Sequence, residues 1–539
     1  MGVPIISNKA RKAKANAGRT GFLGAGSSYV AGDSSADSMS SFHPAQKSAD
    51  AEVLPARDKV TARARDLARN NGWAAGGINK EVDSIIGANF RPILKPDWKA
   101  LGLSEEWASE FKERAEADWR AYADDPRKFA DVTRSQTVSA MFGLGYRTFC
   151  IEGEALGVVS WMPNRLTHTA LRVVDPDLMS NPDGQPDSPR LRSGVVLNKY
   201  GAATHYWFRQ AHPNNGLSYS EGEEFQWKRI PREKRFGRPV VLHHFDKTRD
   251  GQTRGISRLA PIIEKLKMED HYSKVELQAA VLNAVLAAFI KSPMGPNVLD
   301  ELIEAGGDEG DNTLFDSFAR MNTSRSDHYG DSGIKVGGAR VTTLYPNDEI
   351  GMLNTARPAA QFADFEGAVL RNIASGLGIS YEQLASDWSK TNYSSARAAM
   401  IEIWRSWTAR RISFAQGFCQ PFFMAWLEEK VMNGHYQLPR NAPDFRENWL
   451  FYSRAKWVGP GRGFVDPVKE AQASAMRVAL GLSTLEDEAA ELTGSDFKEN
   501  IAQIKREMSD MPKDCLHPMQ ESFAKLIGHN GGPSIQDED

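Results

Sequence analysis

Cysteine is scarce in this chain of 539 residues, with three at Cys150, Cys419 and Cys515. They lie far apart and none has C-x-x-C spacing, which argues against a disulfide framework and a thiolate zinc site. A reducing cytoplasm is therefore the expected compartment of synthesis.

Long apolar runs are missing as well. The longest, residues 279–290, includes Asn283 and is too short to cross a bilayer. The early basic residues are followed by Gly, Ser and Ala, not by an apolar segment, so we expect no secretory signal.

No excess of one charge is present, because 66 Lys and Arg face 69 Asp and Glu. Proteins that bind DNA tightly through its phosphates carry a surplus of cations. The chain as a whole is therefore expected to hold any nucleic acid loosely.

Sequence motifs of catalysis are absent too. No G-x-x-x-x-G-K-[ST] run is present to cradle nucleotide phosphates, and no H-E-x-x-H or G-x-S-x-G motif occurs. Asp175, Asp177 and Asp183 miss the spacing of a calcium loop and indicate plain turns. His243 and His244 adjoin in a predicted strand, so they face opposite sides and cannot bind one metal together. We expect no catalytic residues, no metal and no cofactor.

The first part of the chain, residues 1–54, is rich in Gly, Ser and Ala and carries a basic cluster. We interpret it as a disordered arm. Two roles stay open, a solvated tail or electrostatic contact with DNA or an acidic partner.

The remaining patterns predict an α+β fold that is mainly helical. Apolar spacing predicts helices on both sides of a break at residues 70–72 and another over 105–122, and short β-branched and aromatic runs predict a β-rich part over 157–245. Later helices are expected over 257–291, 358–375 and 396–433, and from Asp466 onward.

The helix expected over 257–291 is apolar nearly all round in its second half. Such a helix is buried on every side, either in a core or between copies of the chain. Residues 292–347, between it and the next helix, collect Pro, Gly and charge and are expected to form an exposed module.

Three stretches resemble the lambda-type family of bacteriophage portal proteins. They are RARDLARNNGWA at 63–74, VLHHFDKTRDGQTRGISRLAPII at 241–263 and GLGISYEQLASDWSKTNYSSARAAMIEIW at 376–404. The resemblance implies a ring of about twelve copies around a DNA channel, with each subunit divided into wing, stem, clip and crown.

On this plan the boundaries follow by position. They are a disordered basic arm (1–54), a wing (55–256), a stem helix (257–291), a clip (292–347), a second stem helix (348–375), a tunnel loop (376–395), a wing helix and return (396–464) and an acidic helical crown and tail (465–539).

The resemblance also implies roles for particular residues. The loop residues expected near the channel are Asp387, Trp388, Lys390, Asn392 and Tyr393, and the alternative is a buried polar turn between helices. Those expected at the oligomer interface are Leu282, Val285 and Phe289, and those expected to contact partners through the clip are Asp308, Glu309 and Asp311.

The implied partners are other copies of the chain, the terminase large subunit, head–tail connector proteins, the major capsid and scaffolding proteins, and double-stranded DNA held weakly and without sequence specificity. The implied location is a capsid vertex of the virion, after assembly in the host cytoplasm. Two alternatives remain: another structural protein of the head, or a DNA-processing enzyme such as a nuclease.

Overall fold

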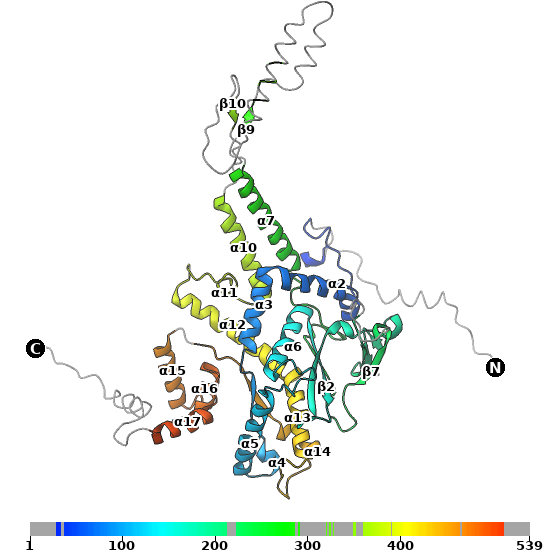
Figure 1. The fold of residues 1–539 in the computed structure, drawn as a ribbon, viewed down its shortest axis with the longest axis vertical. Coiled ribbons are helices and arrows are strands. Elements are labelled where there is room, and N and C mark those ends of the chain that lie inside the picture. The colour runs from blue at the N-terminus through cyan, green and yellow to red at the C-terminus, as the bar shows by residue number, and fades with distance from the viewer. Residues whose placement is uncertain are drawn as a thin grey trace, which may run out of the picture.

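The computed structural model describes residues 29–33, 37–212, 223–285, 289–291, 320, 323–324, 327, 349–351, 359–389, 391–463 and 466–510. Helices dominate this part of the chain and small antiparallel sheets accompany them, which confirms the predicted fold class. Figure 1 shows a body from which one pair of helices projects, with a further group of helices near the C-terminal end. No helix of the described residues has the length and apolar content needed to cross a bilayer.

The helices of the body are α2 (Ala49–Asn70), α3 (Gly72–Ile85), α4 (Trp98–Leu101), α5 (Glu105–Ala123), α6 (Val138–Glu152), α11 (Tyr381–Ala385), α12 (Tyr393–Phe414), α13 (Gln420–Met432) and α14 (Phe445–Tyr452). Short 3-10 turns are η1 (Val30–Gly32), η2 (Pro176–Leu178), η3 (Pro182–Gly184) and η4 (Glu223–Phe225), and η5 (Ala415–Cys419) is a π-helical turn.

The strands of the body are β1 (Arg91–Leu94), β2 (Glu154–Trp161), β3 (Thr169–Val174), β4 (Leu191–Arg192), β5 (Val195–Leu197), β6 (Ala203–Arg209), β7 (Trp227–Pro231), β8 (Val241–Phe245) and β11 (Ala455–Val458). They form sheets of order β3-β2-β8, β4-β5-β6-β7 and β1-β11, all antiparallel. The β-rich part expected over residues 157–245 is therefore confirmed.

The core of the body is aromatic. Trp119 on α5 packs edge to face against Trp426 on α13, with ring centroids 5.0 Å apart. Phe418, in the π-helical turn, stacks on Phe414 at 5.3 Å. The wide turn precedes Pro421, whose missing N–H leaves a gap in the helical hydrogen bonds. The single helix expected over residues 396–433 is therefore interrupted by a π-turn.

The adjacent histidines of β8 lie on opposite faces, as expected. The ring of His243 lies 5.5 Å from Tyr206 on the four-stranded sheet, and the ring of His244 lies 5.5 Å from Phe414 on α12. Both side chains fill packing positions.

The projecting hairpin consists of α7 (Ile263–Val285) and α10 (Ala359–Leu377), which run antiparallel (Figure 1). Tyr272 stacks on Phe362 at 5.6 Å. Beyond these helices, β9 (Phe289–Lys291) pairs with β10 (Glu349–Gly351). At the base, a Cβ on Gly376 would lie 2.3 Å from Cγ2 of Ile262, so the chain leaves the body and returns to it at one place.

The C-terminal helices are α15 (Pro467–Ala479), α16 (Leu485–Leu492) and α17 (Phe497–Asp510). Asp466 and Thr484 cap the first two through bonds to backbone N–H groups, and Asp466 is the helix start expected from the sequence. Nε of Arg477 on α15 donates to Oε1 of Glu488 on α16 at 2.8 Å.

Three predicted boundaries are wrong. The helix expected from residue 257 begins at Ile263, because Pro261 and the turn at residues 257–262 precede it, and Phe289 lies in a strand instead of the helix. The second helix begins at Ala359, within one residue of the start expected at 358, but the boundary of the second stem segment at 348 is wrong, because residues 349–351 pair with β9. The expected arm is also too long: α2 begins at Ala49, where the hydroxyl of Ser48 accepts from the N–H of Ala51.

Candidate DNA-channel segment and its supports

The expected loop over residues 376–395 is not irregular throughout. Its first part forms α11, where Ser380 and Gln383 make reciprocal capping bonds. The described residues 386–389 and 391–392 are irregular, and we call residues 386–392 the channel segment. It starts at Ser386, in the left-handed region with φ 54°, and ends at Asn392, whose side chain accepts from the N–H of Ser395 at 2.9 Å and caps α12.

The structure places part of the expected site within this segment. Asp387 and Trp388 are exposed, and Asn392 has a capping role as well as its place in the segment. Lys390 and the side chain of Tyr393 lie outside the described residues. Because residues 386–389 are exposed, the alternative of a buried polar turn is wrong for them in the single chain.

The expected oligomer residues Leu282 and Val285 lie in the last turns of α7, and their side chains are outside the described part, as is that of Phe289. The clip residues Asp308, Glu309 and Asp311 are outside it too. Sequence reasoning missed exposed apolar side chains on the hairpin, although their residue types are a visible signal. They are Met268, Leu277, Val281 and Phe365.

An ion-pair node joins the body to the base of the hairpin. Glu154 is fully buried, and its carboxylate accepts from Arg57 at 2.6 Å and from Nε of Arg254 at 3.0 Å. Nε2 of His243 lies 3.0 Å from Oε2. Burial alone would raise the pKa of Glu154, but Arg254 and Arg57, with hydrogen bonds from His243 and Arg254, hold this pKa well below its usual range.

A second group of carboxylates has the proximity of a metal site. Glu152, Asp175 and Asp177 bring oxygen atoms within 4.8 Å of one another, while Asp183 lies apart in η3. The guanidinium of Arg65 contacts all three carboxylates. Burial raises the pKa of Glu152 to about 7, against a hydrogen bond from Arg65 that lowers it. Arg65 supplies the cation here, so the group is an ion-pair cluster.

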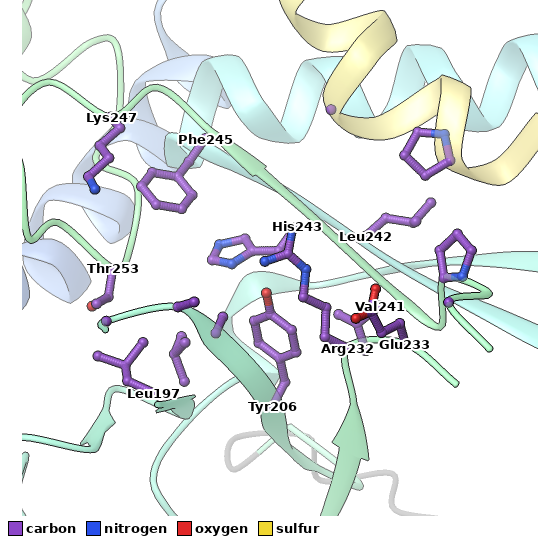
Figure 2. Close-up of a pocket in the computed structure, with 18 of the residues that line it drawn as sticks. Leu197, Tyr206, Arg232, Glu233, Val241, Leu242, His243, Phe245, Lys247 and Thr253 are labelled. Carbon is purple, nitrogen blue, oxygen red and sulfur yellow. The ribbon is translucent and has the colours of Figure 1, made fainter. Parts of the chain in front are cut away.

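A cavity of about 470 Å³ lies between the four-stranded sheet and β8 (Figure 2). Figure 2 shows Tyr206 pointing its hydroxyl toward Arg232 and His243. Lys247 and Thr253 of the wall bind Asp250 and Asp50. Among the described residues of this wall, no hydrogen bond joins a hydroxyl to an imidazole.

The contact between α5 and the C-terminal helices contains Glu116, whose Oε1 accepts from the N–H of Leu94 at 2.6 Å. Burial raises the pKa of this carboxyl to about 7, although Lys112 and the Leu94 bond oppose the shift. The pKa of Glu116 in the folded chain is above the unfolded value of about 4.3. The contribution of Glu116 to the free energy of unfolding is therefore fully present below about pH 4.3 and is lost as the pH rises through about 7.

Glu116→Gln is therefore expected to change little at pH 5 and to raise the free energy of unfolding by about 1–2 kcal/mol at pH 8. Urea unfolding at the two pH values measures the difference. Glu110→Gln, at an exposed position of the same helix, is the control. Its effect on the free energy of unfolding should be the same at pH 5 and at pH 8. An equal effect of Glu116→Gln at pH 5 and pH 8 would contradict the titration.

Comparison with known proteins gives the family of the chain. The model of the family described as "Phage portal protein, lambda family" matches residues 35–411. The portal protein of Escherichia phage N15 is 34% identical over 481 residues, covering 88% of this chain and 89% of that protein. Portal protein B of Escherichia phage lambda is 34% identical over 502 residues, covering 92% and 91%.

Among solved structures, a chain in the neck of an empty gene transfer agent particle matches with a TM-score of 0.43 and 13% identity, covering 81% of this chain and 93% of that chain. The family model and the two curated relatives confirm the resemblance that the sequence motifs indicated. Because that model covers most of the chain and the relatives nearly all of it, the chain belongs to the lambda family of phage portal proteins.

Proposed function

We propose that about twelve copies of this chain close into a ring at one vertex of a virus head, and that double-stranded DNA enters and leaves the head through the ring. The observation that carries the proposal is the likeness to the lambda and N15 portal proteins over 92% and 88% of the chain. Membership of this family gives the chain a structural role in the virion, not an enzymatic one. Assembly in the host cytoplasm is part of the proposal.

The subunit is proposed to divide into the four parts that the family resemblance implies. The body supplies the wing, α7 and α10 the stem, residues 292–347 the clip, and α15 to α17 the crown. Support comes from the antiparallel hairpin, which leaves the body at one end while the C-terminal helices lie apart from it (Figure 1).

The channel segment faces the DNA in this proposal. Asp387 and Trp388 are exposed there, and Lys390 contributes a cation by sequence. DNA must slide past the wall, and each phosphate held by a cation adds to affinity. A segment with one acidic and one basic residue therefore suits passage better than a cationic wall.

The stem forms the contact between neighbouring subunits in the proposed ring, through a heterologous interface that closes. Leu277 and Val281 are 67% and 52% exposed and lie one turn apart, on the side of α7 that helical spacing continues to Val285, whereas Met268, 65% exposed, lies on the opposite side. Exposed apolar side chains on one helix are typical of a surface that another chain covers. Phe289 is proposed to extend this contact from β9.

Electron microscopy of the purified chain tests the function. We expect closed rings with an open axial channel, and Leu282→Asp is expected to leave soluble subunits that form no rings, because a buried charge at the interface has no partner. Size-exclusion chromatography with light scattering gives the mass of each species. If Leu282→Asp still forms intact rings, Leu282 does not lie in the interface between subunits. If the parent chain is monomeric at every concentration, the proposed ring is contradicted.

The clip is proposed to meet the terminase large subunit during filling and a head–tail connector afterwards, through Asp308, Glu309 and Asp311. Support comes from the acidic character of this stretch and from its position in the sequence between the two stem helices. The wing is proposed to contact the major capsid and scaffolding proteins. A chain without residues 308–311 that still bound terminase and connector in a pull-down would exclude this contact.

A further inference from the structure

The channel segment and the first turns of α12 form a stretch that leaves the body. We call this stretch the arm; it is not the basic N-terminal segment of residues 1–54. Leu384 before the segment is buried, and the next buried side chain is Trp407, well inside α12. No described side chain between these two is buried. Among the described side chains of this stretch, burial therefore occurs at its two ends, and Ile403 and Trp404 pack against the core close to the second end.

The first end is bound by Lys80 of α3. Its ammonium donates to the backbone carbonyl of Gln383, in the last turn of α11, and to Oγ of Ser386 at 2.7 Å. Carbonyls in the last turn of a helix have no partner within the helix, and a cation there also interacts favourably with the helix dipole. Lys80 thus gives the carbonyl of Gln383, at the end of α11, a hydrogen-bond donor, and it also holds Ser386, where the channel segment starts.

The second end is bound by Glu81, the next residue of α3. Oε1 of this buried carboxylate accepts from Arg410 of α12 at 3.0 Å and from the hydroxyl of Tyr146 at 2.8 Å. Arg258, which precedes the first helix of the hairpin, donates to the same oxygen. One carboxylate therefore connects α12 to the base of the hairpin.

The same region of α3 lies close to the end of α10. A Cβ on Gly77 would lie 2.7 Å from Cδ1 of Leu377 and 3.6 Å from Cδ1 of Leu384. Gly77, Lys80 and Glu81 are three and four residues apart, so they share one side of the helix. The end of α10, the segment that precedes α7 and both ends of the arm thus meet α3 within about one turn.

We propose that Lys80 and Glu81 are positioning residues that set where the channel segment stands, with Lys80 holding its start and Glu81 holding α12 through Arg410. The role of the arm at the DNA rests on the function proposed above, whereas the two attachments do not.

Hydrogen exchange measured by mass spectrometry on the full-length chain tests the attachments. Lys80→Ala is expected to raise exchange of the backbone amides of residues 381–389 about tenfold, because local opening no longer breaks the two bonds to the ammonium. Lys80→Arg should restore slow exchange, since a guanidinium can donate to both acceptors. Lys59→Ala, at an exposed lysine of α2, is the matched control and should leave residues 381–389 unchanged.

Arg410→Gln tests the other end. Exchange is expected to rise in residues 394–406 and to stay as in the parent chain in residues 381–389, because only the attachment to Glu81 is weakened. Unchanged exchange of residues 381–389 in Lys80→Ala, or of residues 394–406 in Arg410→Gln, would overturn the proposal. Neither readout needs DNA or a ring. If the chain forms no rings but both exchange changes are observed, the two attachments are confirmed and the proposed portal function is contradicted.

Discussion

Replacing Glu154 by glutamine is expected to lower the free energy of unfolding by about 3–5 kcal/mol. The glutamine keeps the size of the side chain but removes the charge that compensates Arg57 and Arg254, the second of which is fully buried. A buried guanidinium without its carboxylate bears the cost of desolvation alone. Urea unfolding followed by tryptophan fluorescence measures the change.

Glu110→Gln is the control for this substitution, because that carboxylate is exposed, and it should change stability by less than about 0.5 kcal/mol. The pKa of Glu154 is depressed, so its contribution is present above the unfolded pKa of about 4.3 and is lost as the pH falls through the folded value. The difference between Glu154→Gln and the parent chain should therefore stay constant from pH 6 to pH 8. A difference below 1 kcal/mol would show that the node contributes little.

Gly153→Ala is expected to abolish folding of the body. Gly153 has φ +89°, and a Cβ there would lie 2.1 Å from the carbonyl carbon and oxygen of Ile256. The clash is with backbone, so no side chain can turn away, and the facing residue, Gly255, has its own close approach to Gly153. We expect a loss above about 4 kcal/mol, beyond the usual range of single substitutions.

The matched comparison is Gly102→Ala. Gly102 also has a positive φ, +66°, but a Cβ there would meet no atom within 4 Å. Its cost is therefore that of the left-handed conformation alone, about 1–2 kcal/mol. Yield of soluble protein and thermal unfolding separate the two variants, and soluble Gly153→Ala that melts like Gly102→Ala would contradict the backbone clash.

Local signals in the sequence predicted much of the fold. The break between α2 and α3 follows from Asn71, which ends one helix and caps the next, and Asp466 and Thr484 mark two later helix starts. The helix expected over residues 105–122 is α5, because its apolar residues recur at helical spacing. Such signals act within a few residues, so a single sequence contains them.

What the sequence missed depends on distant partners. Lys80 bonds to Gln383 and Ser386, and Glu154 bonds to Arg57 and Arg254, across separations that no periodicity encodes. The short strand at residues 289–291 was assigned to a helix for the same reason, because its partner lies at residues 349–351. The channel segment was located through family resemblance, and its true start at Ser386 required the geometry of α11.

The contact between Ile262 and Gly376 has a consequence for how this subunit varies. The whole excursion between residues 262 and 376 starts and ends at one place in the body, so its two ends are already close together. Closing a longer or shorter loop between fixed points changes the entropy only slowly with its length. Insertions and deletions beyond the base are therefore cheap for the body, so the projecting part can diversify to suit different docking proteins while the remainder keeps its sequence constraints.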